Sequence, residues 1–120
     1  MKKVLVVDDS ETIRLEVSRA LVDAGFAVVQ AGDGVEGLEK AKQGELALVL
    51  LDVNMPRMGG MEMLEALKKN PETKGTPVLM LTTEVQESMI DRAKKAGACG
   101  WIYKPPMMPL LVKTVQKVAK

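Results

Sequence analysis

The sequence predicts an α/β fold, a parallel β-sheet covered by helices on both faces, and three observations lead to that prediction. Short runs rich in Val, Leu and Ile alternate with longer segments of helical period. Two of these runs, residues 4–7 and 47–51, are apolar at every position, which is typical of strands buried on both faces. The connections between segments are short, as in repeated strand–helix units whose right-handed crossovers make the strands parallel.

We expect five strands, each followed by a helix. The strands are predicted at residues 3–7, 26–31, 47–51, 77–82 and 100–103. In each helix one apolar face recurs every three or four residues: Ile13/Val17/Leu21/Ala24, Val35/Leu38/Ala41, Met61/Leu64/Leu67, Met89/Ala93/Ala96 and Leu111/Val115/Val118. Ser10 is placed to cap the first helix, and Gly25 stands where that helix should end. A chain of 120 residues has room for one domain, so we expect residues 1–120 to form a single unit.

The composition excludes several kinds of chemistry. The chain has no histidine, which removes Ser-His-Asp and Cys-His catalysis and every histidine-containing metal site. Cys99 is the only cysteine, so no internal disulfide forms, and we interpret it as a small buried residue in a reducing cytoplasm. Seventeen basic against sixteen acidic residues leave a net charge of +1, and no apolar run approaches the roughly 20 residues of a membrane span. We therefore expect neither nucleic acid nor a membrane as a partner.

Polar side chains stand at the carboxyl ends of four predicted strands, where parallel sheets of this kind bind their ligands. They are Asp8 and Asp9 after the first strand, Asp52 after the third, Thr82 at the end of the fourth and Lys104 after the fifth. Two carboxylates ~4 Å apart repel each other by about 4 kcal/mol at an effective dielectric near 20, so three of them need a cation. Oxygen ligands without nitrogen or sulfur nearby favour Mg²⁺.

These residue types can perform phosphoryl transfer. A carboxylate can attack phosphorus to give an aspartyl-phosphate, and Asp52 is the predicted nucleophile because it follows the central strand. Mg²⁺ would screen charge on the phosphoryl oxygens, and the Lys104 ammonium and Thr82 hydroxyl would pair with the others. The alternative is that the acidic residues only cap helices, which explains Asp8 or Asp9 alone better than it explains the whole set.

These motifs, in this order, resemble the receiver domains of two-component response regulators, and among them the stand-alone chemotaxis regulators of the CheY type. The resemblance rests on Asp8-Asp9, Asp52-Val53-Asn54-Met55-Pro56 with Gly59-Gly60, Leu81-Thr82-Thr83-Glu84, and Ala96-Gly97-Ala98 before Lys104-Pro105. It covers essentially all 120 residues. It implies a flavodoxin-like (βα)5 sheet of strand order 2-1-3-4-5, the order of flavodoxin and CheY.

The resemblance also implies a role for each residue of the phosphorylation site. Asp52 would accept a phosphoryl group from a histidine kinase. Asp9, Asp52 and the Asn54 backbone carbonyl would bind Mg²⁺ directly, and Asp8 would act largely through water. The bond between Lys104 and the following proline would be cis, which is a conformation that X-Pro bonds adopt at low cost.

A conformational switch is implied as well. Thr82 would turn toward the phosphoryl group, and Trp101 would follow it inward, where Tyr or Phe is more usual in the family. Asn54 and Glu84 occupy the two variable positions that tune phosphate lifetime. Because polar groups there leave a path for water, we expect a phosphate lifetime on the order of minutes or less.

The last strand is expected to form part of a partner surface. Alternation puts Trp101 and Tyr103 on one face of that strand and Ile102 on the other. With exposed parts of the last two helices, the first of these faces would bind a downstream protein, and the resemblance points to the flagellar motor switch. Met107 and Met108 are expected to pack the start of the last helix, with adaptable partner contacts as the alternative. We expect a monomeric signalling switch rather than an enzyme with turnover.

Several other functions compete with this one. Residues 32–37 match G-x-G-x-x-G after a strand, but Asp33 and Glu36 would place negative charge where a dinucleotide pyrophosphate should lie, and the acidic first loop does not suit FMN. An aspartate-nucleophile phosphatase needs a second Asp two residues after the nucleophile, where this chain has Asn54, which cannot shuttle a proton. A phosphorelay intermediate and the receiver of a larger regulator stay open.

Overall fold

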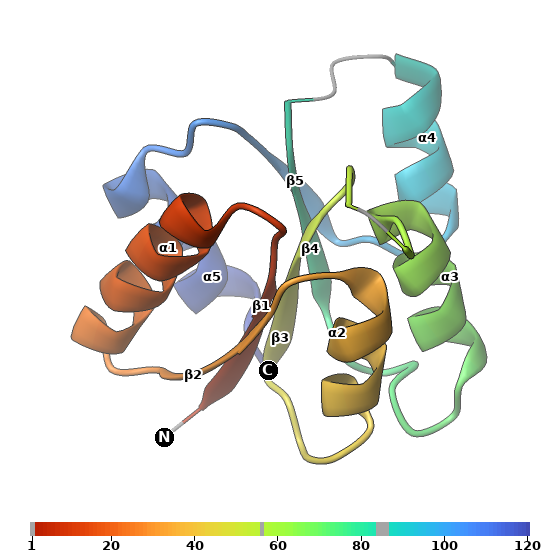
Figure 1. Ribbon diagram of the computed structural model, residues 1–120, viewed down its shortest axis with the longest axis horizontal. Coiled ribbons are helices and arrows are strands. Elements are labelled where there is room, and N and C mark those ends of the chain that lie inside the picture. The colour runs from red at the N-terminus through yellow and green to blue at the C-terminus, as the bar shows by residue number, and fades with distance from the viewer. Residues whose placement is uncertain (1, 56, 84–86) are drawn as a thin grey trace.

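The computed structural model has a twisted central sheet with helices on both sides (Figure 1). It describes residues 2–55, 57–83 and 87–120. The elements found there are β1 (Lys3–Val7), α1 (Glu11–Asp23), β2 (Ala27–Ala31), α2 (Gly34–Ala41), β3 (Leu48–Asp52), α3 (Gly60–Lys69), β4 (Val78–Thr82), α4 (Glu87–Lys95), β5 (Gly100–Tyr103) and α5 (Met108–Val118). The strands are parallel and lie in the order β2-β1-β3-β4-β5. The predicted fold class and strand order are confirmed.

Two hydrophobic clusters hold the helices on the two faces of the sheet. Helices α1 and α5 cover one face, and α2, α3 and α4 cover the other (Figure 1). Within β3, Leu48 and Leu50 face the α1/α5 cluster, whereas Val49 and Leu51 face the α2–α4 cluster. Burial on both faces explains why the central strands are apolar at nearly every position. Along the described segments, no helix combines the length and the apolar composition needed to cross a bilayer.

The helix boundaries follow the predicted capping residues in α1. The Ile13 backbone N–H donates to Ser10 Oγ over 3.3 Å, which caps the start of the helix. Gly25, directly after the C-cap, has a φ of 98°, in the left-handed region that favours glycine. Val17 and Leu21 are fully buried, as the apolar face predicts. The apolar face of α4 is less buried than that of α1, because only Ala93 of the described residues of α4 is buried.

The structure differs from the sequence predictions at several boundaries. Strands β2, β3 and β4 each begin one residue later than predicted, and β3 includes Asp52. Pro77 has no N–H to donate to the sheet, although its carbonyl accepts from Val49 over 2.9 Å. The prediction that Cys99 is buried is wrong. It lies exposed directly before β5, and its thiol donates to the Val78 carbonyl over 3.2 Å.

The register of the strands brings the polar ends together. Val7 of β1 pairs with Leu51 of β3, so that Asp8 and Asp52 follow neighbouring positions in adjacent strands. Thr82 of β4 pairs with Tyr103 of β5, and the Lys104 backbone N–H donates to the Thr82 carbonyl over 2.9 Å. All of these residues therefore lie at the carboxyl edge of the sheet.

Candidate functional site

Three carboxylates meet at the carboxyl edge of the sheet. Asp8 is 0% exposed and Asp52 is 3% exposed, whereas Asp9 is open to solvent. One carboxylate oxygen from each of the three residues lies within 4.8 Å of the other two. The convergence expected from strand ends that lie more than forty residues apart in the chain is thus present in the structure.

A buried lysine lies between two of these acids. Lys104 Nζ is 2.9 Å from Asp8 Oδ2 and 3.2 Å from Asp52 Oδ2, and the Lys104 side chain is only 11% exposed. The bond from Lys104 to Pro105 is cis, as the family resemblance implied. At 2.9 Å the contact with Asp8 is a close ion pair at the carboxyl edge of the sheet.

The protonation of the site reflects burial first and an excess of negative charge second. Burial raises the pKa of the Asp52 carboxyl, the neighbouring Asp8 charge raises it further, and the Lys104 ammonium lowers it only in part, so that the pKa is about 7. Burial opposes the charged form of Lys104, but the contact with Asp8 and the charge of Asp52 outweigh it, and the pKa of Lys104 is raised. One lysine therefore does not balance the buried acids.

The donor set suits a hard divalent cation. It consists of carboxylate oxygens, and the described residues place no nitrogen or sulfur ligand among them. Asp8 Oδ2 is buried and, besides its ion pair with Lys104, can accept a further partner, such as a metal-bound water. Asn54 lies beside the cluster, since its backbone N–H approaches Asp52 Oδ1 at 3.4 Å. Mg²⁺, which takes one or two carboxylates and keeps several waters, fits these residues.

The remaining residues of the predicted site lie around this cluster. Thr82 is completely buried at the end of β4. Trp101 of β5 pairs with Met80 and packs against the α2–α4 cluster, and its indole Nε1 is buried without a hydrogen-bond partner among the described residues. Ile102 packs against the α1/α5 cluster, so the predicted alternation of these two residues is confirmed. Glu84 and Pro56 lie outside the described residues.

Comparisons with known proteins identify the family. The profile of the response regulator receiver domain matches residues 4–116. The chain belongs to the response regulator receiver family. This receiver is 38% identical over 117 residues to the chemotaxis protein CheY-3 of Vibrio cholerae, covering 97% of this chain and 90% of that protein. It is 34% identical over 117 residues to the chemotaxis protein CheY of Pseudomonas aeruginosa, covering 97% and 94%.

Solved structures agree with that assignment. The crystal structure of chemotaxis protein CheY4 of Vibrio cholerae superimposes on this receiver with a TM-score of 0.93 and 46% sequence identity, covering 98% of both chains. A CheY-like receiver domain protein of Methanospirillum hungatei gives a TM-score of 0.92 at 29% identity, covering 98% of this chain and 92% of that one. The CheY-type resemblance seen in the motifs is therefore confirmed.

Sequence reasoning missed a basic residue of the receiver that lies beside the acids. Arg14 of α1 donates from Nη1 to the Asp8 backbone carbonyl over 2.8 Å and from Nε to Gln30 Oε1 over 3.1 Å. It joins the loop that carries Asp8 to the edge strand β2. The only signal in the sequence is its place one turn after the Ser10 cap, which says nothing about the direction of its side chain.

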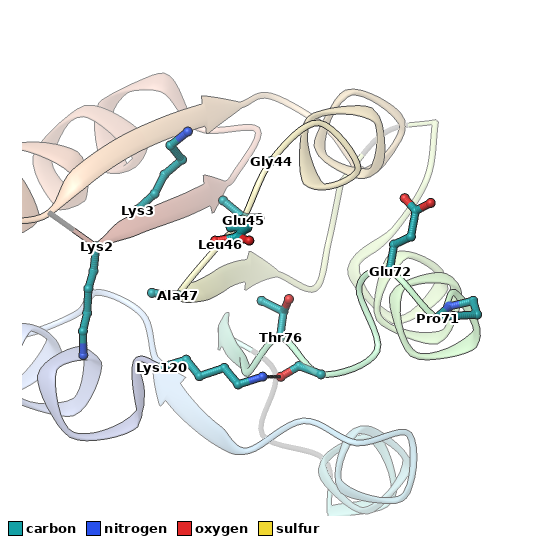
Figure 2. A pocket seen from close by; sticks show the side chains of 11 residues that line it. Lys2, Lys3, Gly44, Glu45, Leu46, Ala47, Pro71, Glu72, Thr76 and Lys120 are labelled. Carbon is teal, nitrogen blue, oxygen red and sulfur yellow. Dashed lines mark hydrogen bonds between the residues drawn. The ribbon is translucent and has the colours of Figure 1, made fainter.

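A groove lies at the opposite edge of the sheet from the acid cluster. This groove of about 690 Å³ is lined by charged residues that include Lys2, Lys3, Glu45, Glu72 and Lys120. Figure 2 shows that the Lys120 ammonium reaches the backbone of a neighbouring loop, and it donates to the Gly75 carbonyl over 3.1 Å. The groove lies where β1, β3 and β4 begin, far from the acid cluster, and contains none of the predicted site residues.

Proposed function

We propose that the protein is a phospho-acceptor response regulator in which Asp52 takes a phosphoryl group from a histidine kinase with the help of Mg²⁺. The observation that supports this most strongly is the meeting of Asp8, Asp9, Asp52 and Lys104 at one edge of the sheet, at 2.9 and 3.2 Å for the two lysine contacts. In this proposal residues 1–120 act as one receiver domain. Its monomeric state and its cytoplasmic location stay predictions.

Asp52 acts as the nucleophile. One of its oxygens forms a bond to phosphorus while the phosphorus–nitrogen bond of the donor phosphohistidine breaks, and the imidazole nitrogen leaves with the electron pair. A pKa of about 7 in the metal-free protein leaves this carboxyl partly protonated at neutral pH. The Mg²⁺ ion would supply positive charge for the carboxylates and the phosphoryl oxygens. Asp9, Asp52 and the Asn54 carbonyl would hold the ion directly, with Asp8 acting mainly through water.

Lys104 and Thr82 stabilise the transferred group. The Lys104 ammonium already lies 3.2 Å from Asp52 Oδ2, so it can move to a phosphoryl oxygen once that carboxylate is phosphorylated. The Thr82 hydroxyl would donate to another phosphoryl oxygen. Transfer of this kind depends on positioning and charge, which these side chains supply without a histidine on the receiver itself.

Phosphorylation is coupled in this proposal to a surface on α4, β5 and α5. Thr82 and Trp101 are the switch residues, and Asn54 and Glu84 set the phosphate lifetime. Met107 is 72% exposed, and Tyr103 and Leu110 are also largely exposed. The prediction that Met107 packs the helix start is wrong, whereas Met108 does pack against the α1/α5 cluster. An exposed apolar group of this kind is suited to a protein partner, in chemotaxis the flagellar motor switch.

The central claim is tested by labelling the protein with a small acyl-phosphate donor and Mg²⁺. Wild type should take one phosphoryl group, and Asp52→Asn should take none. The label should be lost on treatment with hydroxylamine, and also by hydrolysis when Mg²⁺ is present without EDTA. Asp91→Asn, an exposed acid on α4, is the matched control and should label as wild type does. Label that survives in Asp52→Asn overturns the assignment of Asp52.

The partner is tested with the phosphorylated and unphosphorylated protein. A flagellar switch protein should bind the phosphorylated form more tightly in a pull-down. If phosphate instead passes to a histidine phosphotransfer protein, the phosphorelay function replaces the motor function. Continuous hydrolysis of an added phosphomonoester would favour a phosphatase, which the amide of Asn54 argues against.

A further inference from the structure

The glycine-rich motif at residues 32–37 has no role in the function proposed so far, yet it contacts the loop that follows the phospho-acceptor strand. The Gly34 backbone N–H donates to the Met58 carbonyl over 3.2 Å. A β-carbon on Gly34 would lie 2.5 Å from that same oxygen, so only glycine allows this approach. The start of α2 is therefore the surface on which Met58 of the β3–α3 loop lies.

Asp33 joins the same two segments with its side chain. Its Oδ1 accepts from the Glu36 backbone N–H over 2.9 Å and caps α2. Its Oδ2 accepts from Arg57 Nε over 3.0 Å and from Arg57 Nη2 over 2.6 Å. One carboxylate thus fixes the start of α2 and holds an arginine of the β3–α3 loop.

The backbone of Arg57 has an uncommon conformation. Its φ of 64° lies in the left-handed region, which is costly for any residue with a β-carbon and is usually occupied by glycine or asparagine. From this position the Arg57 guanidinium makes its two-point contact with Asp33. Arg57 is the only described residue other than glycine with a positive φ.

The other end of the loop is fixed by backbone contacts. The Gly60 N–H donates to the Val53 carbonyl over 2.8 Å. A β-carbon on Gly60 would collide with the Asp52 carbonyl oxygen, so α3 begins directly against the phospho-acceptor strand. Asn54 lies between this contact and the Arg57 contact, and its carbonyl is the one expected to bind Mg²⁺.

We propose that Asp33 and Arg57 are positioning residues, whose ion pair holds the β3–α3 loop on the start of α2 and so keeps the Asn54 main chain beside Asp52. The role rests on the proposed function of the Asp52 site. It also gives the glycine-rich motif a purpose, which is to provide a close-fitting support for the loop rather than to bind a nucleotide.

The expected effect is local rather than global. The Arg57 side chain is 62% exposed, and exposed ion pairs contribute little to overall stability. Loss of the pair should therefore leave the melting temperature nearly unchanged. It should raise the population of open loop conformations, and weaken Mg²⁺ binding, by about two- to five-fold.

The test compares matched variants of the whole chain. Arg57→Asn keeps a residue that tolerates positive φ but removes the guanidinium, and Asp33→Ser keeps the helix cap but removes the charge. Arg57→Lys keeps the charge without the two-point contact, and should fall between Arg57→Asn and wild type. Arg92→Gln breaks an exposed ion pair of 3.1 Å to Glu65, away from the loop, and serves as the control.

Two measurements are made on each variant, amide hydrogen exchange of Asn54, Met58 and Gly59 without metal, and the Mg²⁺ dissociation constant by titration calorimetry. We expect the exchange rates and the Mg²⁺ dissociation constant to rise by the same factor in Arg57→Asn, in Asp33→Ser and in their double variant. Arg92→Gln should match wild type in both quantities. If Arg57→Asn lowers the melting temperature more than the control does, Arg57→Gly, which suits positive φ, repeats the test.

If Arg57→Asn has the same exchange rates and the same Mg²⁺ affinity as Arg92→Gln, the positioning role is overturned. A double variant with twice the effect of the singles would also overturn it, because the two residues would then act independently. If the wild type takes no label from the acyl-phosphate donor, the proposed phospho-acceptor function is overturned instead. Failure of the positioning role can be distinguished from failure of the proposed function, because loop exchange is measured without phosphorylation.

Discussion

The two edges of the sheet use their charged side chains in opposite ways. At the amino edge, Lys68 donates to the carbonyls of Lys74 and Thr76 over 3.1 and 2.8 Å, and Lys120 donates to Gly75. These ammonium groups complete the hydrogen bonding of loop backbones near solvent. At the carboxyl edge, buried Asp8 and Asp52 share one lysine, and negative charge remains in excess. Charged side chains at the amino edge hold loop backbones in place, whereas the excess charge at the carboxyl edge is available for a ligand.

The largest difference between the edges should appear when the lysines are removed. Lys104→Met leaves Asp8 and Asp52 buried without a cation, and we expect it to lower the free energy of unfolding of the metal-free protein at pH 8 by about 3 kcal/mol. Urea unfolding in EDTA measures this. A loss below about 1 kcal/mol would mean that the acids are compensated by something other than Lys104.

The pH dependence of stability should come from the carboxyl edge. The pKa of Asp52 is about 7 in the folded protein and about 3.9 in the unfolded chain, so the folded state binds more protons between these values. The contribution to stability is therefore full below about pH 4, falls as the pH rises to about 7, and is constant above, with a slope of at most about 1.4 kcal/mol per pH unit.

The control for this pH dependence is Asp52→Asn, which removes the titrating group. Its metal-free free energy of unfolding should be flatter between pH 4 and 7 than that of wild type, and higher at pH 8. Urea unfolding in EDTA at several pH values compares the two. Parallel curves would show that other groups carry the dependence.

Mg²⁺ should stabilise the protein through the same edge. A cation bound only to the folded state at about ten times its dissociation constant adds about 1.4 kcal/mol to the free energy of unfolding. Asp9→Asn, an exposed member of the acid cluster, should reduce that gain, which thermal unfolding with and without Mg²⁺ measures. An equal gain in Asp9→Asn and wild type would place the ion elsewhere.

The smallest effect is expected at the amino edge. Lys120→Met removes an exposed hydrogen bond to Gly75, and we expect a change in unfolding free energy within about 0.5 kcal/mol, independent of Mg²⁺. The same urea and thermal experiments measure it. A loss as large as that of Lys104→Met would remove the distinction between the edges.

The carboxyl edge could be predicted because it depends on topology. Once the strands are taken as parallel, Asp8, Asp52 and Thr82 must lie at the same edge of the sheet, whatever the details of packing. Strand order needed the family resemblance, since alternation of strands and helices does not determine which strands are neighbours. Strands β2, β3 and β4 start one residue later than predicted, because hydrogen bonding rather than hydrophobicity determines where a strand begins.

The contacts that support the site could not be predicted in the same way. Arg57 reaches Asp33 across 24 positions of sequence from a backbone conformation that its residue type does not suggest. Cys99 and Met107 stand directly before β5 and α5 and are exposed there, so their apolar character alone was misleading. Residue type thus predicted the groups that are proposed to carry the chemistry, but not the side-chain contacts around their loops.

Trp101 gives the protein a built-in optical probe. It is the only tryptophan of the chain, so selectively excited indole emission comes from a single ring. That ring lies on β5 and packs against the α2–α4 cluster, and its N–H is buried without an acceptor among the described residues. Gain of an acceptor or of water by this N–H shifts the emission to longer wavelength, so movement of the ring can be followed in real time without a label.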